Sequence, residues 1–384
     1  MTQKAKKKNN AIEFYRFLFT LFLTFGHLIV FGWRTNGKIQ TESGFLFLGG
    51  ARVLGFFLFL SGYLMMAHYQ SRKRKGLTDG EASKQAWEYD LRRYAAMIPT
   101  MFGSVLFCFV VINIACGTPL SKIPSLLMRS WWEFLGLHQL GLGGYNEMKT
   151  LEAFSEAINT TNVSVMWNGP LWYVSAMLIV GVVLYYVLAK NEDLFKGFFA
   201  PLVIIGSYGY AMLNQGAEFD RVTTGWLGIP NNILRVGAGM CVGALLYYVV
   251  EYLKKIEETP KKRTILTILH AFFACYFVYT AWFGIKWTEF ANNAFVLPFM
   301  AVLLINQDAI SDFLNNSFCG YLGSLSLYMY CYHVGIIWLL VYFAPNLNYA
   351  QTAPLHVLGV VGISIIAKWI DMKFIKPQTN KLFQ

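Results

Sequence analysis

The sequence predicts an all-α integral membrane protein, a bundle of about ten transmembrane helices with both termini in the cytoplasm. Three observations lead to this fold class. Of the 384 residues, 56% are hydrophobic and only 14% are charged, whereas a soluble domain carries about 25% charged residues. The apolar residues form long runs, each close to the roughly 20 residues that cross a bilayer core. The basic residues gather in the segments between alternate runs. A soluble fold is therefore excluded.

The expected helices are ten apolar runs, which in chain order are 11–33, 45–69, 96–116, 170–189, 197–213, 231–252, 264–284, 290–306, 318–343 and 354–375. They predict a single membrane domain over residues 1–384, with a basic cytoplasmic tail at 1–10. The longest external segment is 117–169, and it contains a short amphipathic helix at 123–137. The eighth run is short and contains Pro298, so a kink is expected there.

The distribution of Lys and Arg sets the expected orientation. Segments on the side of the N-terminus hold about three times as many basic residues as segments on the other side, which follows the positive-inside rule. An odd number of helices would break this alternation. Membrane orientation therefore explains the formal net charge of +11. The chain carries no motif that reads RNA or DNA, so a nucleic-acid partner is not expected.

Ionisable side chains inside the first helix are the strongest functional candidates, because charge within a membrane is costly. Arg16 and His27 are eleven residues apart. That spacing is close to three helical turns, so both side chains lie on one face, about 16 Å apart along the axis. Glu13 lies one turn before Arg16 and is placed to pair with it. A structural interpretation stays open, in which His27 bonds a neighbouring carbonyl and Arg16 reaches toward the interface.

Other helices supply further candidates. His333 lies at a depth similar to that of His27, and Arg52 and Arg235 fall in the outer halves of their helices. Either arginine could instead be a contact between helices. Trp172 near the outer face belongs to an aromatic belt or serves as a platform for a sugar ring. No His-x3-His or His-Glu-x2-His arrangement occurs, so no metal site is predicted. We assign structural roles to the remaining histidines: His68, His138, His270 and His356.

Four motifs follow one another along the chain. They are Arg16 with His27 in the first helix, the aromatic segment 56–63 that contains Ser61-Gly62, the pair Leu171-Trp172, and the segment 321–333 that ends at His333. Together they resemble the signature of membrane acyltransferase family 3, the bacterial O-acyltransferases that modify surface glycans. No single motif is specific, but their order and their span from residue 16 to residue 333 make the resemblance strong.

Two departures from the family pattern concern the third and fourth helices. Members often have two arginines three residues apart and then a proline. Here Arg93 and Pro99 fit, but Ala96 stands at the second arginine, and Arg92 is the substitute, on a different helical face. Many members also carry a Glu shortly after the Leu-Trp pair, and this chain has none there. Any role that this Glu has in other members of the family is therefore not assigned to this chain.

The resemblance implies transfer of an acyl group, most often acetyl, from acyl-CoA to a hydroxyl of a surface carbohydrate, in the cell (plasma or inner) membrane. Acyl-CoA would be a co-substrate, and no permanently bound cofactor is expected. Arg16 with Arg92 or Arg93 would bind the donor phosphates, because guanidinium groups pair well with phosphate oxygens. His27 would act as general base on the acceptor hydroxyl, or would carry the acyl group covalently. His333 would orient His27 or bind the acceptor.

Ser61 is a candidate nucleophile or donor contact. By residue count it lies in the inner half of the membrane, away from His27, so we favour contact with the donor or helix packing. Trp172, Arg52 and Arg235 are the candidates for binding the acceptor. A transporter or flippase for a polar or glycan-linked substrate is the alternative function, since buried charges fit it too. No internal repeat supports that alternative, and the oligomeric state stays open.

Overall fold

The structure is a computed structural model that describes residues 9–28, 53–138, 150–160, 165–214, 229–283 and 288–381. Within these residues the chain is helical and has no β-strand. The longer helices are α1 (Asn10–His27), α2 (Leu54–Arg74), α3 (Ala82–Ala115), α6 (Trp172–Lys190), α8 (Ala200–Asn214), α9 (Asn231–Lys255), α10 (Pro260–Phe283), α11 (Glu289–Ile305), α14 (Ser326–Phe343) and α15 (Tyr349–Ile370). The shorter helices are α4 (Ile123–Phe134), α5 (Leu151–Asn159), α7 (Glu192–Leu194), α12 (Ala309–Leu314), α13 (Ser317–Gly323) and α16 (Lys376–Lys381).

Seven helical segments among the described residues are long and apolar enough to cross a membrane: 82–115, 169–190, 192–214, 231–255, 260–283, 326–343 and 349–378. The chain is therefore a multi-pass membrane protein, as predicted. Helices lie at all ten expected positions wherever these are described, although the first two expected helices extend into residues outside that part. The total of ten spans and the cytoplasmic placement of both termini stay predictions.

The third helix starts much earlier than expected, at Ala82 instead of near residue 96. Its added turns are amphipathic: Ala86 and Tyr89 are buried in the core, while Trp87 is exposed. Packing on one face thus extends the helix beyond its apolar run. Arg92 and Arg93 consequently lie inside α3 instead of before it.

The expected helix 318–343 is two helices, because the chain breaks between α13 and α14 at Ser324-Leu325. Gly323, the last residue of α13, packs closely against α1, since a Cβ there would lie 2.4 Å from Cβ of Glu13. The Ser324 hydroxyl donates to the carbonyl of Tyr321 at 2.5 Å and satisfies part of the helix end. The break lets α13 pack on α1 while α14 packs on α3 and α15.

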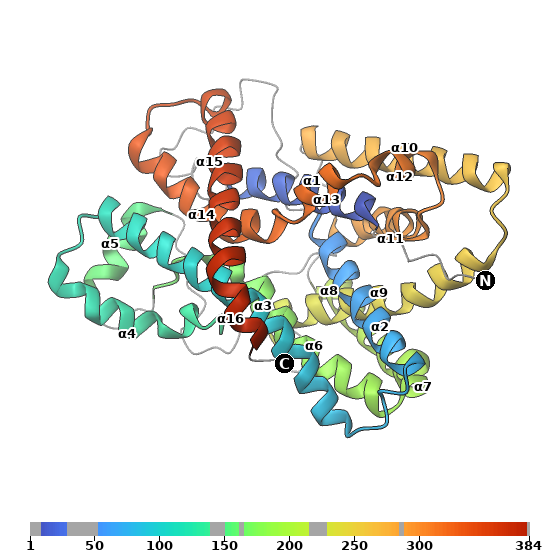
Figure 1. Cartoon of the computed structure of the whole chain (residues 1–384). Coiled ribbons are helices and arrows are strands. Elements are labelled where there is room, and N and C mark those ends of the chain that lie inside the picture. Colours follow the sequence, from blue (N-terminus) through green and yellow to red (C-terminus); the bar gives the residue numbers. More distant parts are fainter. Residues whose placement is uncertain are drawn as a thin grey trace.

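Helix α5 was not expected from the sequence, since it lies in a stretch that composition marks as polar. The Thr150 hydroxyl accepts a hydrogen bond from the backbone N–H of Ala153 and caps the helix start. Phe154 and Ile158 are buried on its inner face. Figure 1 shows α4 and α5 together on the left, on the far side of the molecule from α7 and the N-terminus.

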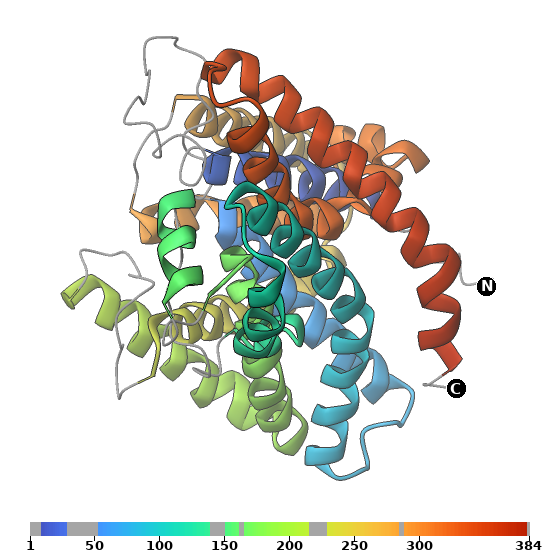
Figure 2. The same cartoon turned by 90° about the vertical axis from the view of Figure 1, so that its left-hand side faces the viewer.

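Helix α1 lies inside the bundle, whereas α15 runs along its periphery, as both views show (Figures 1 and 2). The start of α1 is held by the residue that follows α12: Asn315 Oδ1 accepts from the backbone N–H of Asn10 at 2.8 Å and of Ala11 at 3.2 Å. Further along, the Tyr15 hydroxyl lies 2.9 Å from His270 Nε2 of α10. These contacts fix the position of α1 relative to its neighbours.

The closest helix pair is α2 and α9. A Cβ at Gly62 would lie 1.8 Å from the carbonyl oxygen of Met240, and a Cβ at Gly243 would lie 1.9 Å from that of Phe59. Small residues at a helix interface let two backbones touch, which is how membrane helices gain van der Waals contact. At one end of this pair, α2 finishes in Arg72, Lys73 and Arg74 and α3 begins. We call this end of the molecule the basic end.

Candidate functional site

One face of α1 organises the site. Arg16, Thr20, Leu23 and His27 are spaced four, three and four residues apart, so their side chains form a line along the helix. Arg16 Nη1 donates to Glu13 Oε2 at 2.8 Å, which confirms the expected pair. The Arg16 side chain is 34% exposed, so it remains accessible beside this contact. The helix thus presents a cation at one end of the line and an imidazole at the other.

A cavity of about 240 Å³ lies along this face and is enclosed by five helices, α1, α2, α3, α6 and α14. It brings together three of the predicted donor-binding residues, Arg16, Ser61 and Arg93. Its other polar side chains are Thr20, Tyr173, Ser326 and Tyr330. Along α1 the lining ends at Leu23, one helical turn before His27. An elongated ligand with anionic groups at one end would match this arrangement.

His27 and His333 form a pair next to that cavity. His27 Nδ1 lies 2.8 Å from His333 Nε2, and the two rings stack with centroids 4.9 Å apart at an interplanar angle of 14°. His27 is 6% exposed and His333 is fully buried. The sequence predicted only that these residues lie at a similar depth, and in the structure they are in direct contact between α1 and α14.

The hydrogen bonds of this pair determine which nitrogen of each neutral ring carries its proton. His333 Nδ1 lies 2.7 Å from the carbonyl oxygen of Tyr330, which only accepts, so Nδ1 is the donor. His333 Nε2 then carries a lone pair and accepts from His27 Nδ1. It follows that the lone pair of His27 is on Nε2, the arrangement that a general base needs.

Tyr330 links the histidine pair to the cavity, and the sequence analysis gave it no role. Its ring lines the cavity and lies 5.9 Å from the ring of His333. Its hydroxyl donates to the carbonyl oxygen of Pro170, and its own carbonyl orients His333. The signal was available, because Tyr330 and His333 are three residues apart and so share a helical face.

Of the other predicted residues that the structure describes, Arg92, Trp172 and Arg235 do not line the cavity. Arg92 is exposed on a different face of α3. Arg235 lies over the ring of Trp172, with 5.9 Å between its guanidinium carbon and the ring centroid. Trp172 is 3% exposed and Arg235 is 8% exposed, so the pair is buried between helices. Arg52 lies outside the described residues.

Helix α4 positions the turn that precedes Trp172. Glu133 is fully buried, and its carboxylate accepts the backbone N–H groups of Trp167 at 2.8 Å and Asn168 at 2.6 Å. The side chain of Asn168 in turn donates to the carbonyl oxygen of Cys331 at 2.8 Å, two residues before His333. Sequence reasoning missed Glu133, although it is the single acidic residue in the segment 123–137.

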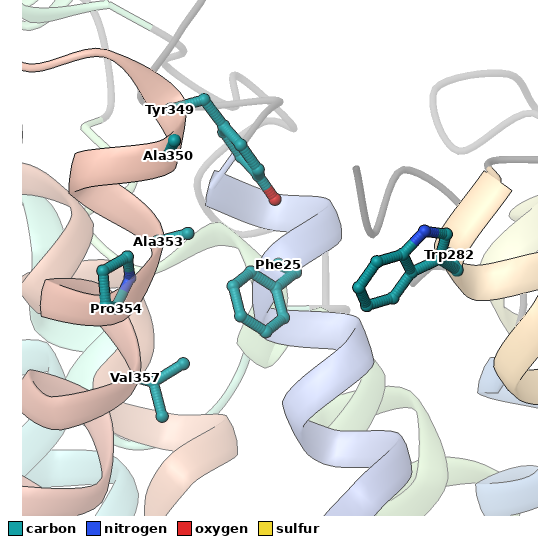
Figure 3. Close-up of a pocket in the computed structure, with 7 residues that line it drawn as sticks. All are labelled: Phe25, Trp282, Tyr349, Ala350, Ala353, Pro354 and Val357. Carbon is teal, nitrogen blue, oxygen red and sulfur yellow. The ribbon is translucent and has the colours of Figure 1, made fainter. Parts of the chain in front are cut away.

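A second cleft, of about 320 Å³, lies between α1, α10 and α15, and Phe25, Trp282 and Tyr349 converge on it (Figure 3). Two helical steps of about 100° separate Phe25 from His27, so the cleft is on the opposite face of α1 from the imidazole. It does not belong to the site. In the part of the chain that the structure describes, no three His, Cys, Asp or Glu side chains are grouped to hold a metal ion.

Comparison with known proteins gives one finding. A family model described as an acyltransferase domain matches residues 9–370, which contain both histidines and every charged residue of the cavity. No curated protein and no solved structure matches the chain.

Proposed function

The chain belongs to the acyltransferase family that this domain defines, acyltransferase family 3, and from that premise we propose that it transfers an acyl group from acyl-CoA to a hydroxyl of a carbohydrate. The observation that carries the proposal is the line of side chains on α1, with a cation at the cavity and a paired imidazole beyond it. In this proposal the basic end faces the cytoplasm of the cell membrane, where acyl-CoA is made.

The donor would lie along the cavity. Arg16 and Arg93 would pair with its diphosphate, because guanidinium groups form charge-assisted hydrogen bonds to phosphate oxygens. The pantetheine arm carries amide groups that need partners in a dry cavity. The hydroxyl of Ser326 is suited to this role, because the side chain is 3% exposed, lines the cavity and has no hydrogen-bond partner among the described residues. Ser61 and Tyr173, whose hydroxyl oxygens are 3.4 Å apart, offer two more polar groups.

The reaction would use Nε2 of His27 as the base. This nitrogen accepts the proton of the acceptor hydroxyl while the hydroxyl oxygen attacks the carbonyl carbon of the thioester. The C–S bond breaks, and the departing CoA thiolate takes the proton back from Nε2, so the products are an acyl ester and CoA. His333 Nε2 accepts from Nδ1–H throughout, which stabilises the imidazolium that forms on His27.

The proposal is tested on the glycans themselves. Cells that express the wild-type chain, and cells that express His27→Ala at the same level, are compared by mass spectrometry of their surface glycans. We expect acyl-sized mass increments that depend on the wild-type chain and are missing with His27→Ala. Identical glycans from the two strains, with both proteins present in the membrane, would count against the acyltransferase mechanism. Purified wild type that releases CoA from acetyl-CoA only when the glycan is added would support it.

A further inference from the structure

The line of side chains on α2 continues beyond the cavity toward the basic end. Ser61 and Leu64 line the cavity, and Leu64 is 54% exposed, so it marks the mouth. His68 and Arg72 follow at spacings of four and four residues and therefore share the face of Leu64. A ligand that leaves the cavity past Leu64 would meet these two side chains next.

His68 lies on an aromatic stack that begins at a residue of the cavity. The guanidinium carbon of Arg93 is 5.2 Å from the ring centroid of Tyr89, and that ring is 5.3 Å from the ring of His68. Tyr89 also stacks on Tyr185 at 4.4 Å with an interplanar angle of 17°. The two tyrosines are buried, whereas His68 is exposed. An exposed imidazole thus lies one helical turn beyond Leu64 at the cavity mouth.

Two guanidinium groups accompany His68. Arg72 lies one turn after His68 on α2, and Arg92 lies one turn after Tyr89 on α3, the residue whose ring contacts His68. Arg72 Nη1 lies 3.8 Å from Glu88 Oε2, a loose contact, and its Nη2 donates to the carbonyl of Leu77 at 3.1 Å. Arg92 is exposed. The His68 ring nitrogens have no hydrogen-bond partner among the residues that the structure describes, so the group can receive a ligand without breaking a bond.

We propose that His68, Arg72 and Arg92 bind the adenosine 3′-phosphate end of the donor, an inference that rests on the proposed function. The adenine ring would stack on His68, because bases stack on aromatic side chains. The 3′-phosphate would pair with Arg72 and Arg92. Arg92 then acts at the outer end of the donor instead of sharing the diphosphate with Arg16, and His68 has a binding role in place of the structural one expected from the sequence.

Successive parts of the donor would thereby bind along one path from His27 to the cavity mouth. The thioester lies toward His27, the pantetheine arm follows the cavity, and the diphosphate meets Arg16 and Arg93. The nucleoside then lies over the mouth at His68. A cationic site at a membrane surface could also attract the phosphate of an anionic lipid headgroup. The experiment therefore separates a nucleotide phosphate from a lipid phosphate.

Full-length protein is placed in nanodiscs of zwitterionic lipid, and its affinity is measured for three donors: acetyl-CoA, acetyl-3′-dephospho-CoA and acetyl-4′-phosphopantetheine. We expect Arg72→Ala and Arg92→Ala each to weaken acetyl-CoA binding about tenfold, the factor that corresponds to one lost phosphate contact. Binding of the dephosphorylated donor should stay unchanged. His68→Ala should weaken both nucleotide donors and leave acetyl-4′-phosphopantetheine unaffected. Lys75→Ala, an exposed cation just beyond α2, is the matched control and should change nothing.

The outcomes separate this subsite from the function it rests on. If wild type acylates its acceptor but all variants bind the three donors as wild type does, the subsite is refuted and the function stands. If His68→Ala lowers the affinity for all three donors equally, His68 has a structural role, and the subsite is also refuted. The measurements are repeated in nanodiscs of anionic lipid, and losses of affinity that occur only there identify a lipid headgroup as the ligand and refute the subsite. If wild type acylates with none of the donors, the proposed function itself is refuted.

Discussion

Single residues decide the chemistry, and His27 differs from an ordinary buried histidine because two hydrogen bonds in series fix its proton. The Tyr330 carbonyl orients His333, and His333 then orients His27. Neither bond involves a carboxylate, because the acceptors are a backbone carbonyl oxygen and an imidazole nitrogen. The arrangement makes the reactivity of His27 depend on a backbone oxygen of α14.

His27→Ala should lower the rate of acyl transfer by about 10²–10⁴-fold, the usual contribution of a general base. Donor affinity should change little, since the cavity lining ends before His27. The measurement is single-turnover acylation beside equilibrium binding of acetyl-CoA. His333→Ala should give a smaller loss and an altered pH profile, because it removes the group that fixes the proton of His27. Wild-type turnover by His27→Ala would return both histidines to structural roles.

Arg16→Ala should weaken acyl-CoA binding by about 1.5–3 kcal/mol, the net value of a hydrogen bond to a charged group. Arg16→Lys should recover only part of this affinity, since an ammonium lacks the planar fork of a guanidinium. Removal of Arg16 also leaves Glu13 without this partner near the phosphates. The double variant Glu13→Gln with Arg16→Ala controls for that carboxylate. Equal affinity of wild type and Arg16→Ala would refute the donor model.

The sequence predicted which residues form the site better than it predicted the residues that contact them in the folded chain. Helical spacing alone placed Arg16 and His27 on one face, and counting residues placed His333 at the right depth. Spacing within one helix cannot tell which helices become neighbours, so the role of Glu133 was missed, since its carboxylate binds backbone N–H groups of another element. The Tyr330 hydroxyl likewise bonds the carbonyl of Pro170 outside its own helix, whereas its contact with His333 lies within α14.

At the scale of elements, the apolar runs predicted the helices and missed the places where packing overrides them. Helix α3 continues over a charged stretch because one of its faces is buried there. The apolar run after residue 317 breaks into α13 and α14, and Gly323 at this break packs against the backbone of α1. Hydropathy measures transfer to lipid and carries no information on such close contacts.

Gly323→Ala should displace α1 near its charged pair. The added Cβ would lie 2.5 Å from the backbone oxygen of Glu13, a contact that no side-chain rotation relieves. We expect weaker donor binding and a lower melting temperature. Gly209→Ala is the matched control, because this helical glycine has no atom within 4 Å of the new Cβ. The two variants are compared by acetyl-CoA affinity and thermal unfolding in detergent. A Gly323→Ala protein that behaves like the control would show that α1 tolerates the shift.

The junction of α1, α10 and α12 should contribute strongly to stability. His270 Nδ1 donates to Asp308 Oδ1 at 2.8 Å, and both side chains are fully buried. His270→Ala leaves a buried carboxylate with Ser311 as its remaining side-chain partner, so we expect a loss of about 3 kcal/mol in unfolding free energy. Tyr15→Phe removes only one neutral hydrogen bond and should cost about 1 kcal/mol. Thermal unfolding of both variants tests this order, and equal effects would contradict it.

At the scale of the whole molecule, the distribution of basic residues predicts the topology. Reporter fusions after Lys75 and after Lys262 should report a cytoplasmic location. Fusions near Asn146 and Asn346 should report an external one, because they lie on the side with few basic residues. Alkaline phosphatase and green fluorescent protein fusions, read in intact cells, make the measurement. A cytoplasmic signal near Asn146 would overturn the orientation and place the histidine end toward the wrong compartment for a surface glycan.

The fold class could be predicted from the composition, whereas the arrangement of the helices could not. A charge content of 14% and the apolar runs suffice to exclude a soluble protein. The order in which helices surround α1 depends on shape at many contacts, and no periodicity in one segment encodes its partner. The enclosure of the cavity by five helices is therefore visible only in the folded chain.

The backbone contact between α2 and α9 bears on the motion that the protein can undergo. Alternating-access carriers work by rocking two bundles against each other, and the interface between the bundles opens and closes in each cycle. Gly62 and Gly243 each bring one backbone against the carbonyl of the other helix, so a separation there would lose contact over the full interface at once. We therefore expect helices α2 and α9 to move as one body, with no passage for a substrate between them.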